Sequence, residues 1–287
     1  MLAPRPAPVA EGQRIPGGIQ QSPDRTIRMT LIDPGPIGAE TTTNLYFAQV
    51  AVGGGYVTVF GLVNTGSTPA VGNLILKDQA GNDFVVSGNA PSVRSQPSSN
   101  DLVDAAGSSF PLTIPGGGTR FFAVSAVNST DATKSGWARF ESAGGSMGGV
   151  GTFQFTQGGV LTTVAGVLAS QPVQFATIPV DDNDSQRRYT GYAVANPGTQ
   201  SINVKLVLVN ENGTIAESIN PPTMNPLAPQ SQVARFLSGD FPARTTFKGS
   251  MVLIGQGGNT FVVVALVLNQ GLFTAIPVIP EKAPAIN

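Results

Sequence analysis

The side chains that most often carry enzyme chemistry are scarce in this chain. Its 287 residues include no histidine, no cysteine and only 17 aspartates and glutamates. The two missing types exclude a Ser–His–Asp triad, a cysteine nucleophile and any zinc site built on thiolate or imidazole ligands. Carboxylate chemistry remains, as in a glycoside hydrolase, but no two acids stand out as a catalytic pair. We therefore expect a protein that is not an enzyme.

The densest group of oxygen ligands is an acidic run that contains Asp181, Asp182 and Asp184. Calcium binds about six to eight oxygen atoms, and acidic loops at domain junctions often supply them. The run lacks the spacing of an EF-hand, and Arg187 and Arg188 follow closely enough to neutralise it. Two interpretations stay open here, a calcium site and a solvated acidic turn, and we expect no other cofactor.

A second candidate is the segment 62–67, which is similar to the active-site loop of a pepsin-type aspartic protease. That reaction needs two carboxylates that share a proton. This chain has Asn64 at the decisive position, and the related segment of the second half has Asn196. The pattern therefore predicts turns that end strands, without a catalytic role.

The only tryptophan, Trp137, lies in the alternating segment 136–140. A lone tryptophan can stack on a sugar in a carbohydrate-binding module, or it can anchor the core of a sandwich. The alternation favours the core, and the four tyrosines do not cluster as an aromatic platform.

Composition also limits the partners. Charged residues make up 11% of the chain and the net charge is −1, against a usual charged share of about 25%. Without a basic cluster, nucleic acid is not an expected partner. The longest apolar run, residues 261–268, is far shorter than the roughly 20 residues of a membrane span. Low charge suits a protein that packs against copies of itself.

The elements that must position these side chains are strands, and they repeat. Residues 60–66 match residues 192–198, and residues 74–81 match residues 206–213, at the same offset of 132. Short alternating segments end in turn signals such as Asn212-Gly213, and no helical periodicity is present. The pattern predicts an all-β fold of two tandem Ig-like antiparallel β-sandwiches, residues 45–172 and 173–287.

One short motif occurs three times, at 47–52, 175–180 and 273–278. The first two copies open the two sandwiches. We interpret the third copy as an extra first strand, able to pair with a neighbouring molecule. The residues expected to form that contact are Phe273, Ile276 and Val278.

An arm of residues 1–44 precedes the sandwiches. Its many prolines and glycines favour extended backbone and exclude a helix. Within it, residues 26–32 alternate with period two, which places Ile27, Met29 and Leu31 on one apolar face of a strand. An isolated strand cannot satisfy its backbone alone, so it must join a sheet of this molecule or of another.

The phrase Ala51–Gly66 resembles a repeat found in uncharacterised secreted bacterial β-sandwich proteins. With the later segments 196–198 and 276–278, the resemblance covers residues 45–278. It implies an exported protein with a sandwich fold and implies no reaction. The N-terminal residues lack an apolar signal core, which fits either a protein that is not exported or a mature form whose signal has been removed, and we favour the mature form. The arm is similar in design to pilus subunits held together by donor strands.

Two functions are compatible with these expectations. The leading hypothesis is a non-catalytic structural subunit of an extracellular filament or surface assembly, which polymerises head-to-tail by β-strand addition. The partner is then the protein itself, and the location is extracellular or the cell surface. The alternative is a monomeric surface adhesin or carbohydrate-binding module.

Overall fold

The structure of the chain is a computed structural model that describes residues 20–21, 27–28, 44–89 and 105–281. The chain forms two units, residues 1–40 and residues 41–287. In the first unit, β1 (Gln20–Gln21) pairs antiparallel with β2 (Ile27–Arg28). Of the three arm residues expected to mediate assembly, Ile27 lies in β2 opposite Gln21. The other two, Met29 and Leu31, lie outside the described residues.

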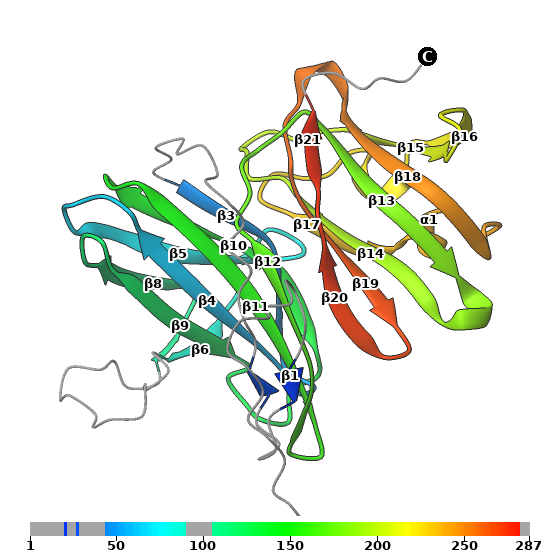
Figure 1. Cartoon of the computed structure of the whole chain (residues 1–287). Coiled ribbons are helices and arrows are strands. Elements are labelled where there is room, and N and C mark those ends of the chain that lie inside the picture. The colour runs from blue at the N-terminus through cyan, green and yellow to red at the C-terminus, as the bar shows by residue number, and fades with distance from the viewer. Residues whose placement is uncertain (1–19, 22–26, 29–43, 90–104, 282–287) are drawn as a thin grey trace, which may run out of the picture. The chain divides into compact units, whose positions relative to one another are not determined.

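The second unit begins with a sandwich of two antiparallel sheets, which we call repeat 1 (Figure 1). Its first sheet has the order β3-β10-β5-β8, and its second has the order β12-β11-β4-β9-β6-β7. Apolar side chains alternate along the strands and fill the space between the sheets, with Phe47, Phe60, Phe122 and Phe140 fully buried. The strands are β3 (Asn44–Val52), β4 (Tyr56–Asn64), β5 (Ala70–Asp78), β6 (Val86–Asn89), β7 (Ala105–Gly107), β8 (Ser109–Ile114), β9 (Thr119–Ser125), β10 (Lys134–Ala143), β11 (Met147–Gln157) and β12 (Val160–Leu168).

A second sandwich, repeat 2, follows. One layer has the order β16-β15-β18-β13-β21 and the other has the order β17-β14-β19-β20. The layers are continuous only where Asn183 of β13 pairs with Arg188 of β14. The strands are β13 (Phe175–Asn183), β14 (Arg188–Ala195), β15 (Val204–Asn210), β16 (Ile215–Ile219), β17 (Gln232–Phe236), β18 (Thr246–Gly255), β19 (Val262–Asn269), β20 (Leu272–Ile276) and β21 (Ile279–Glu281). The short helices are η1 (Asp184–Gln186), η2 (Pro222–Met224), α1 (Leu237–Asp240) and η3 (Gln256–Gly258).

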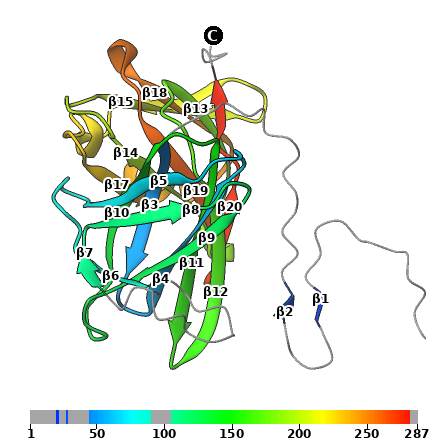
Figure 2. The same ribbon diagram turned by 90° about the vertical axis from the view of Figure 1, so that its left-hand side faces the viewer.

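The two repeats share one strand order. The sheet β8-β5-β10-β3 corresponds to β16-β15-β18-β13, and the strands β12-β11-β4-β9 correspond to β20-β19-β14-β17. The paired strands of the described residues run antiparallel, as the views in Figures 1 and 2 show. The prediction of an all-β fold of antiparallel sandwiches is therefore confirmed. No helix in the described part of the chain is long and apolar enough to cross a membrane.

The third copy of the motif does not open a new sandwich, which corrects its interpretation as an extra first strand. Phe273 and Ile276 lie in β20, where they pair with Leu268 and Ala265 of β19. Val278 packs against the core of repeat 2. The motif therefore closes repeat 2. The alternation of a short motif shows that it is a strand, but the pairing partner depends on contacts distant in sequence.

The first two copies are also displaced from each other in space. Phe47 lies opposite Ala138, whereas the residue in the equivalent place of repeat 2, opposite Met251, is Ile178. Ala138 also pairs with Leu76, and Met251 also pairs with Leu208. Because Leu76 and Leu208 are 132 positions apart, Ala138 and Met251 occupy equivalent places in the two repeats. The motif aligns Phe47 with Phe175 in sequence, but the structural equivalent of Phe47 is Ile178, three residues later.

Candidate functional site

The structure places the three acids of the acidic run in different surroundings. Asp181 makes an ion pair of 3.1 Å with Arg188, and Asp182 points away from it because adjacent strand residues face opposite sides. Asp184 lies in η1, beyond the end of β13. Across the described ranges, no three acidic, histidine or cysteine residues are grouped as metal ligands. The structure thus leaves the three candidate ligands apart.

Asp182 is nevertheless unusual, because its carboxylate is buried. Its Oδ1 accepts a hydrogen bond of 2.6 Å from the backbone N–H of Thr190. Burial raises the pKa of this carboxyl above its ordinary value, and the hydrogen bond from Thr190 opposes the rise only in part. The group links β13 to β14 near their single point of pairing.

The two asparagines of the protease-like turns have the same structural role. Asn64 Nδ2 donates to the carbonyl oxygens of Thr68 and Ile114, and its Oδ1 accepts from Gly66 N–H at 3.0 Å. Asn196 repeats this pattern, and its Oδ1 accepts from Gly198 N–H at 3.0 Å. Both side chains are buried. They hold the turns that end β4 and β14, as the sequence predicts.

Trp137 is fully buried in a cluster that both repeats build. Its indole N–H donates to the carbonyl oxygen of Gln230 in repeat 2 at 2.6 Å. It therefore anchors the contact between the repeats and presents no face on which a sugar could stack. The buried residues of this inter-repeat cluster are Ala48, Ala51, Trp137, Phe153, Ala165 and Val167 from repeat 1, and Ala193, Ala195, Val262 and Val264 from repeat 2.

Two glutamines add polar contacts around this cluster. Gln232 donates from its side chain to Ala48 O at 3.2 Å and from its backbone to Gln79 O at 3.1 Å. Gln230 accepts from Arg139 through its side-chain oxygen and donates to Pro197 O at 2.6 Å. The contact between the repeats is therefore a third apolar core with a hydrogen-bonded rim, which suits a fixed joint.

The outer strands β12 and β20 also meet at this joint. Each is the last strand of its own sheet, and the backbone N–H of Phe273 in β20 donates to Thr163 Oγ1 in β12 at 3.0 Å. Each repeat thus covers an edge of the other, which protects both edges from pairing with a foreign strand. Phe273 and Ile276 are consequently involved in contacts within the molecule.

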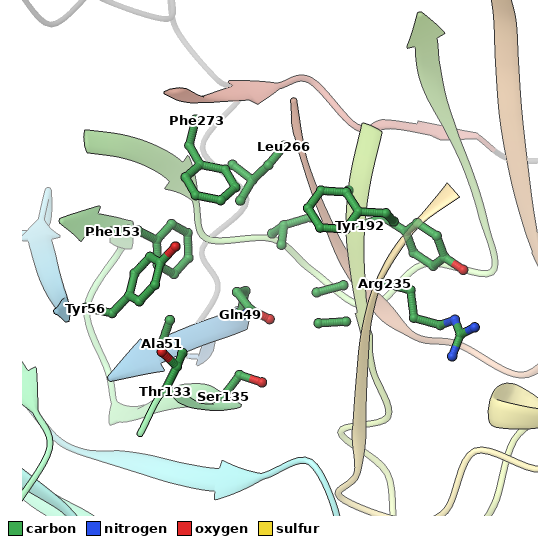
Figure 3. A pocket seen from close by; sticks show the side chains of 15 residues that line it. Gln49, Ala51, Tyr56, Thr133, Ser135, Phe153, Tyr192, Arg235, Leu266 and Phe273 are labelled. Atoms are coloured by element: carbon green, nitrogen blue, oxygen red, sulfur yellow. The ribbon is translucent and has the colours of Figure 1, made fainter. Parts of the chain in front are cut away.

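A pocket of about 270 Å³ lies between the repeats, beside the inter-repeat cluster. Figure 3 shows Tyr56, Phe153, Leu266 and Phe273 gathered along it, with Ser135 and other small polar side chains nearby. Such a lining suits a small, mainly apolar ligand. The full lining is Gln49, Ala51, Tyr56, Thr133, Ser135, Phe153, Gly191, Tyr192, Ala193, Ala234, Arg235, Phe236, Val264, Leu266 and Phe273.

The charged side chain of the pocket is already neutralised. Arg235 Nε donates to Asp240 Oδ2 at 3.0 Å, and the Tyr192 hydroxyl donates to the same carboxylate. Burial and the neighbouring Asp240 raise the pKa of Tyr192, so its hydroxyl stays protonated. The lining therefore provides hydrogen-bonding groups without a free acid or base. The sequence offered no signal for Arg235, Gln230 or Gln232, because their roles depend on the packing of the two repeats.

Comparisons of the chain with protein-family models, with curated proteins and with solved structures find no match. Function is therefore inferred from the geometry of the molecule. That geometry comprises a fixed joint between two sandwiches, a neutral pocket at the joint and the faces and edges left uncovered.

Proposed function

We propose that the protein is a non-catalytic structural subunit of an extracellular filament or surface assembly and that it polymerises with copies of itself. The observation that carries this proposal is the joint between the repeats. Two sandwiches of one design are united by a shared apolar core that includes the only tryptophan. A building block of an assembly benefits from such a joint, because it keeps the contact surfaces of each subunit in a fixed relation.

The strand at residues 26–32 of the arm is the proposed donor. In strand addition, main-chain hydrogen bonds provide affinity and alternate side chains fill pockets. Ile27, Met29 and Leu31 have this alternation. A donor at one end of the subunit and an acceptor at the other make a head-to-tail contact that does not close, which produces a fibre.

We propose β8 (Ser109–Ile114) as the acceptor edge. Other outer strands already have contacts within the molecule: β12 and β20 cover each other, Gln79 binds the N–H of Gln232 in β17, and Arg244 binds Ala216 O in β16 at 3.1 Å. Among the outer strands of the described residues, β8 is the longest whose only such contact lies at its end, where Ile114 O accepts from Asn64 Nδ2. Pro111 supplies no N–H, so the donor strand finds one hydrogen-bond donor fewer along β8.

The arm is tested by comparing the unaltered chain with two variants, one shortened and one of full length. We expect negative-stain electron microscopy to show regular fibres for the unaltered chain. Deletion of residues 1–33, or substitution of Ile27, Met29 and Leu31 by serine in an arm of normal length, should abolish them. Fibres that survive both changes would remove the arm from the mechanism. A 29.5 kDa monomer at all concentrations of the unaltered chain would overturn the proposed function.

The pocket favours a second candidate, the monomeric binding module. Trp137 is not available to a sugar, so the ligand would enter the pocket between the repeats. Its neutral, aromatic lining would select a small uncharged ligand with an apolar body. A screen of neutral aromatic and sugar ligands by thermal shift checks this candidate, with Phe153→Ala as the variant that should lose binding.

A further inference from the structure

The outward face of β9, β4, β11 and β12 in repeat 1 is apolar and uncovered in the described residues. We infer that this face binds the same face of a second copy of this chain and so forms a two-fold dimer. The inference rests on the proposed self-assembly and adds a second contact to it, distinct from the arm. We call this surface the outer face of repeat 1.

Strand register places the side chains of this face in rows. One row runs through Phe121, Gly61, Val150 and Leu168, one residue from each of the four strands. Phe121 is 51% exposed and Leu168 is 52% exposed. The strands lie side by side in both views of the molecule (Figures 1 and 2). Gly61 has no side chain, and the Phe121 ring and the Val150 side chain lie over it.

Charge is absent from the outward positions of these strands. The next row runs through Ala123, Val59, Thr152 and Gly166, again without an acid or a base. An antiparallel sheet with one face in water normally alternates apolar and polar residues. An uncovered sheet face that is apolar and uncharged over four strands therefore indicates a contact surface.

The equivalent face of repeat 2 is a contact surface. By the offset of 132 and the strand register, Gly61 corresponds to Ala193 and Val150 corresponds to Val264. Ala193 and Val264 belong to the inter-repeat cluster, where they pack against repeat 1. The equivalent face of repeat 2 is thus buried against a sandwich, while that of repeat 1 has no sandwich to meet within the described residues.

The second copy must supply an uncharged surface. The surface that repeat 1 offers to repeat 2, with Ala51 and Trp137, is already covered in every copy. Its counterpart in repeat 2 has Asp181 opposite Lys248 and has Ser250 in place of the tryptophan. Burying those charges against an apolar face would be costly. The second copy can instead offer its own outer face of repeat 1, which has no charged residue to bury. A contact between two identical faces forms a closed dimer.

The test uses the full chain with Ile27, Met29 and Leu31 replaced by serine, so that the arm can no longer act as a donor strand. Sedimentation velocity over a concentration series should show a dimer. Phe121→Ser and Leu168→Ser should each raise the dissociation constant about tenfold or more. Val71→Ser is the matched control, because Val71 is 55% exposed on the other sheet of repeat 1 and should leave the dimer unchanged. Circular dichroism checks that each variant retains its fold.

The outcomes separate this inference from the proposed function. If the unaltered chain forms fibres but the chain with the substituted arm stays monomeric, the dimer is wrong and the filament proposal stands. A dimer that Phe121→Ser and Leu168→Ser leave intact also overturns the inference. If no fibres form and the dimer depends on Phe121, the inference stands without the filament. Flotation of monomers with lipid vesicles in a Phe121-dependent manner would overturn it in favour of a membrane surface.

Discussion

At the residue scale, Asp182 is the most informative side chain. A buried carboxylate in contact with one backbone N–H is less favourable when charged than in water, so its folded-state pKa is raised. Folding then favours proton uptake by this group. The contribution of Asp182 to stability is therefore more favourable below the raised pKa and is lost as the pH rises through it.

The corresponding prediction concerns Asp182→Asn. The amide oxygen can still accept from Thr190 N–H, and the cost of a buried charge disappears, so the variant should be more stable than the wild type at pH 7. The advantage should shrink as the pH falls toward the ordinary pKa of aspartate, about 3.9, where the wild type becomes protonated. Urea unfolding at several pH values measures the difference. A constant difference would show that the carboxyl has an unshifted pKa.

At the element scale, β4 and β14 end in the same type of turn, in which a buried asparagine bonds the backbone. A strand that leaves a buried sheet exposes carbonyl oxygens that still need partners. Asn64 and Asn196 satisfy them from within the turn, through donation to backbone carbonyls and acceptance from the glycine N–H two residues later. Loss of such a side chain leaves buried polar groups unpaired.

We therefore expect Asn64→Ala and Asn196→Ala each to lower the free energy of unfolding by about 1–3 kcal/mol. Aspartate at either position would keep the acceptor but lose the donor, and should also destabilise. The control is Asn73→Ala, because Asn73 is exposed on β5 and should change stability by less than about 0.5 kcal/mol. Equal effects at Asn73 and Asn64 in denaturant titrations would contradict this role of the turns.

At the scale of the whole molecule, the inter-repeat cluster couples the two sandwiches. Trp137 reports on this cluster directly because it is the only tryptophan and is fully buried. Residues 41–287 form one compact unit, so the two repeats should unfold together. Tryptophan fluorescence and far-UV circular dichroism should then follow a single transition with one midpoint.

Substitution of the tryptophan should weaken this coupling. Trp137→Ala should cost about 3–5 kcal/mol, since it opens a cavity and leaves Gln230 O without its donor. Trp137→Phe keeps much of the packing and should cost clearly less. Calorimetry of both variants separates packing from hydrogen bonding, and two resolved transitions in the unaltered chain would contradict a shared core.

Local patterns in the sequence are enough to predict the fold class and to exclude chemistry that needs histidine or cysteine. Alternation with period two and the Asn-Gly turn predicted antiparallel sandwiches, and the offset of 132 correctly aligned Asn64 with Asn196. These features depend on the order of residues along the chain, so they can be recognised in one sequence. The absence of histidine and cysteine is likewise visible without any structure.

The pairing of strands and the burial of their faces become visible in the three-dimensional structure alone. Periodicity shows that Phe273 and Ile276 belong to a strand, but the strand beside them lies elsewhere in the chain. Val150 and Val264 occupy equivalent outward positions, yet only Val264 is buried, because the other repeat packs on it. Alternation specifies the two sides of a strand, whereas burial depends on what packs against each side, and a linear pattern contains no record of that partner.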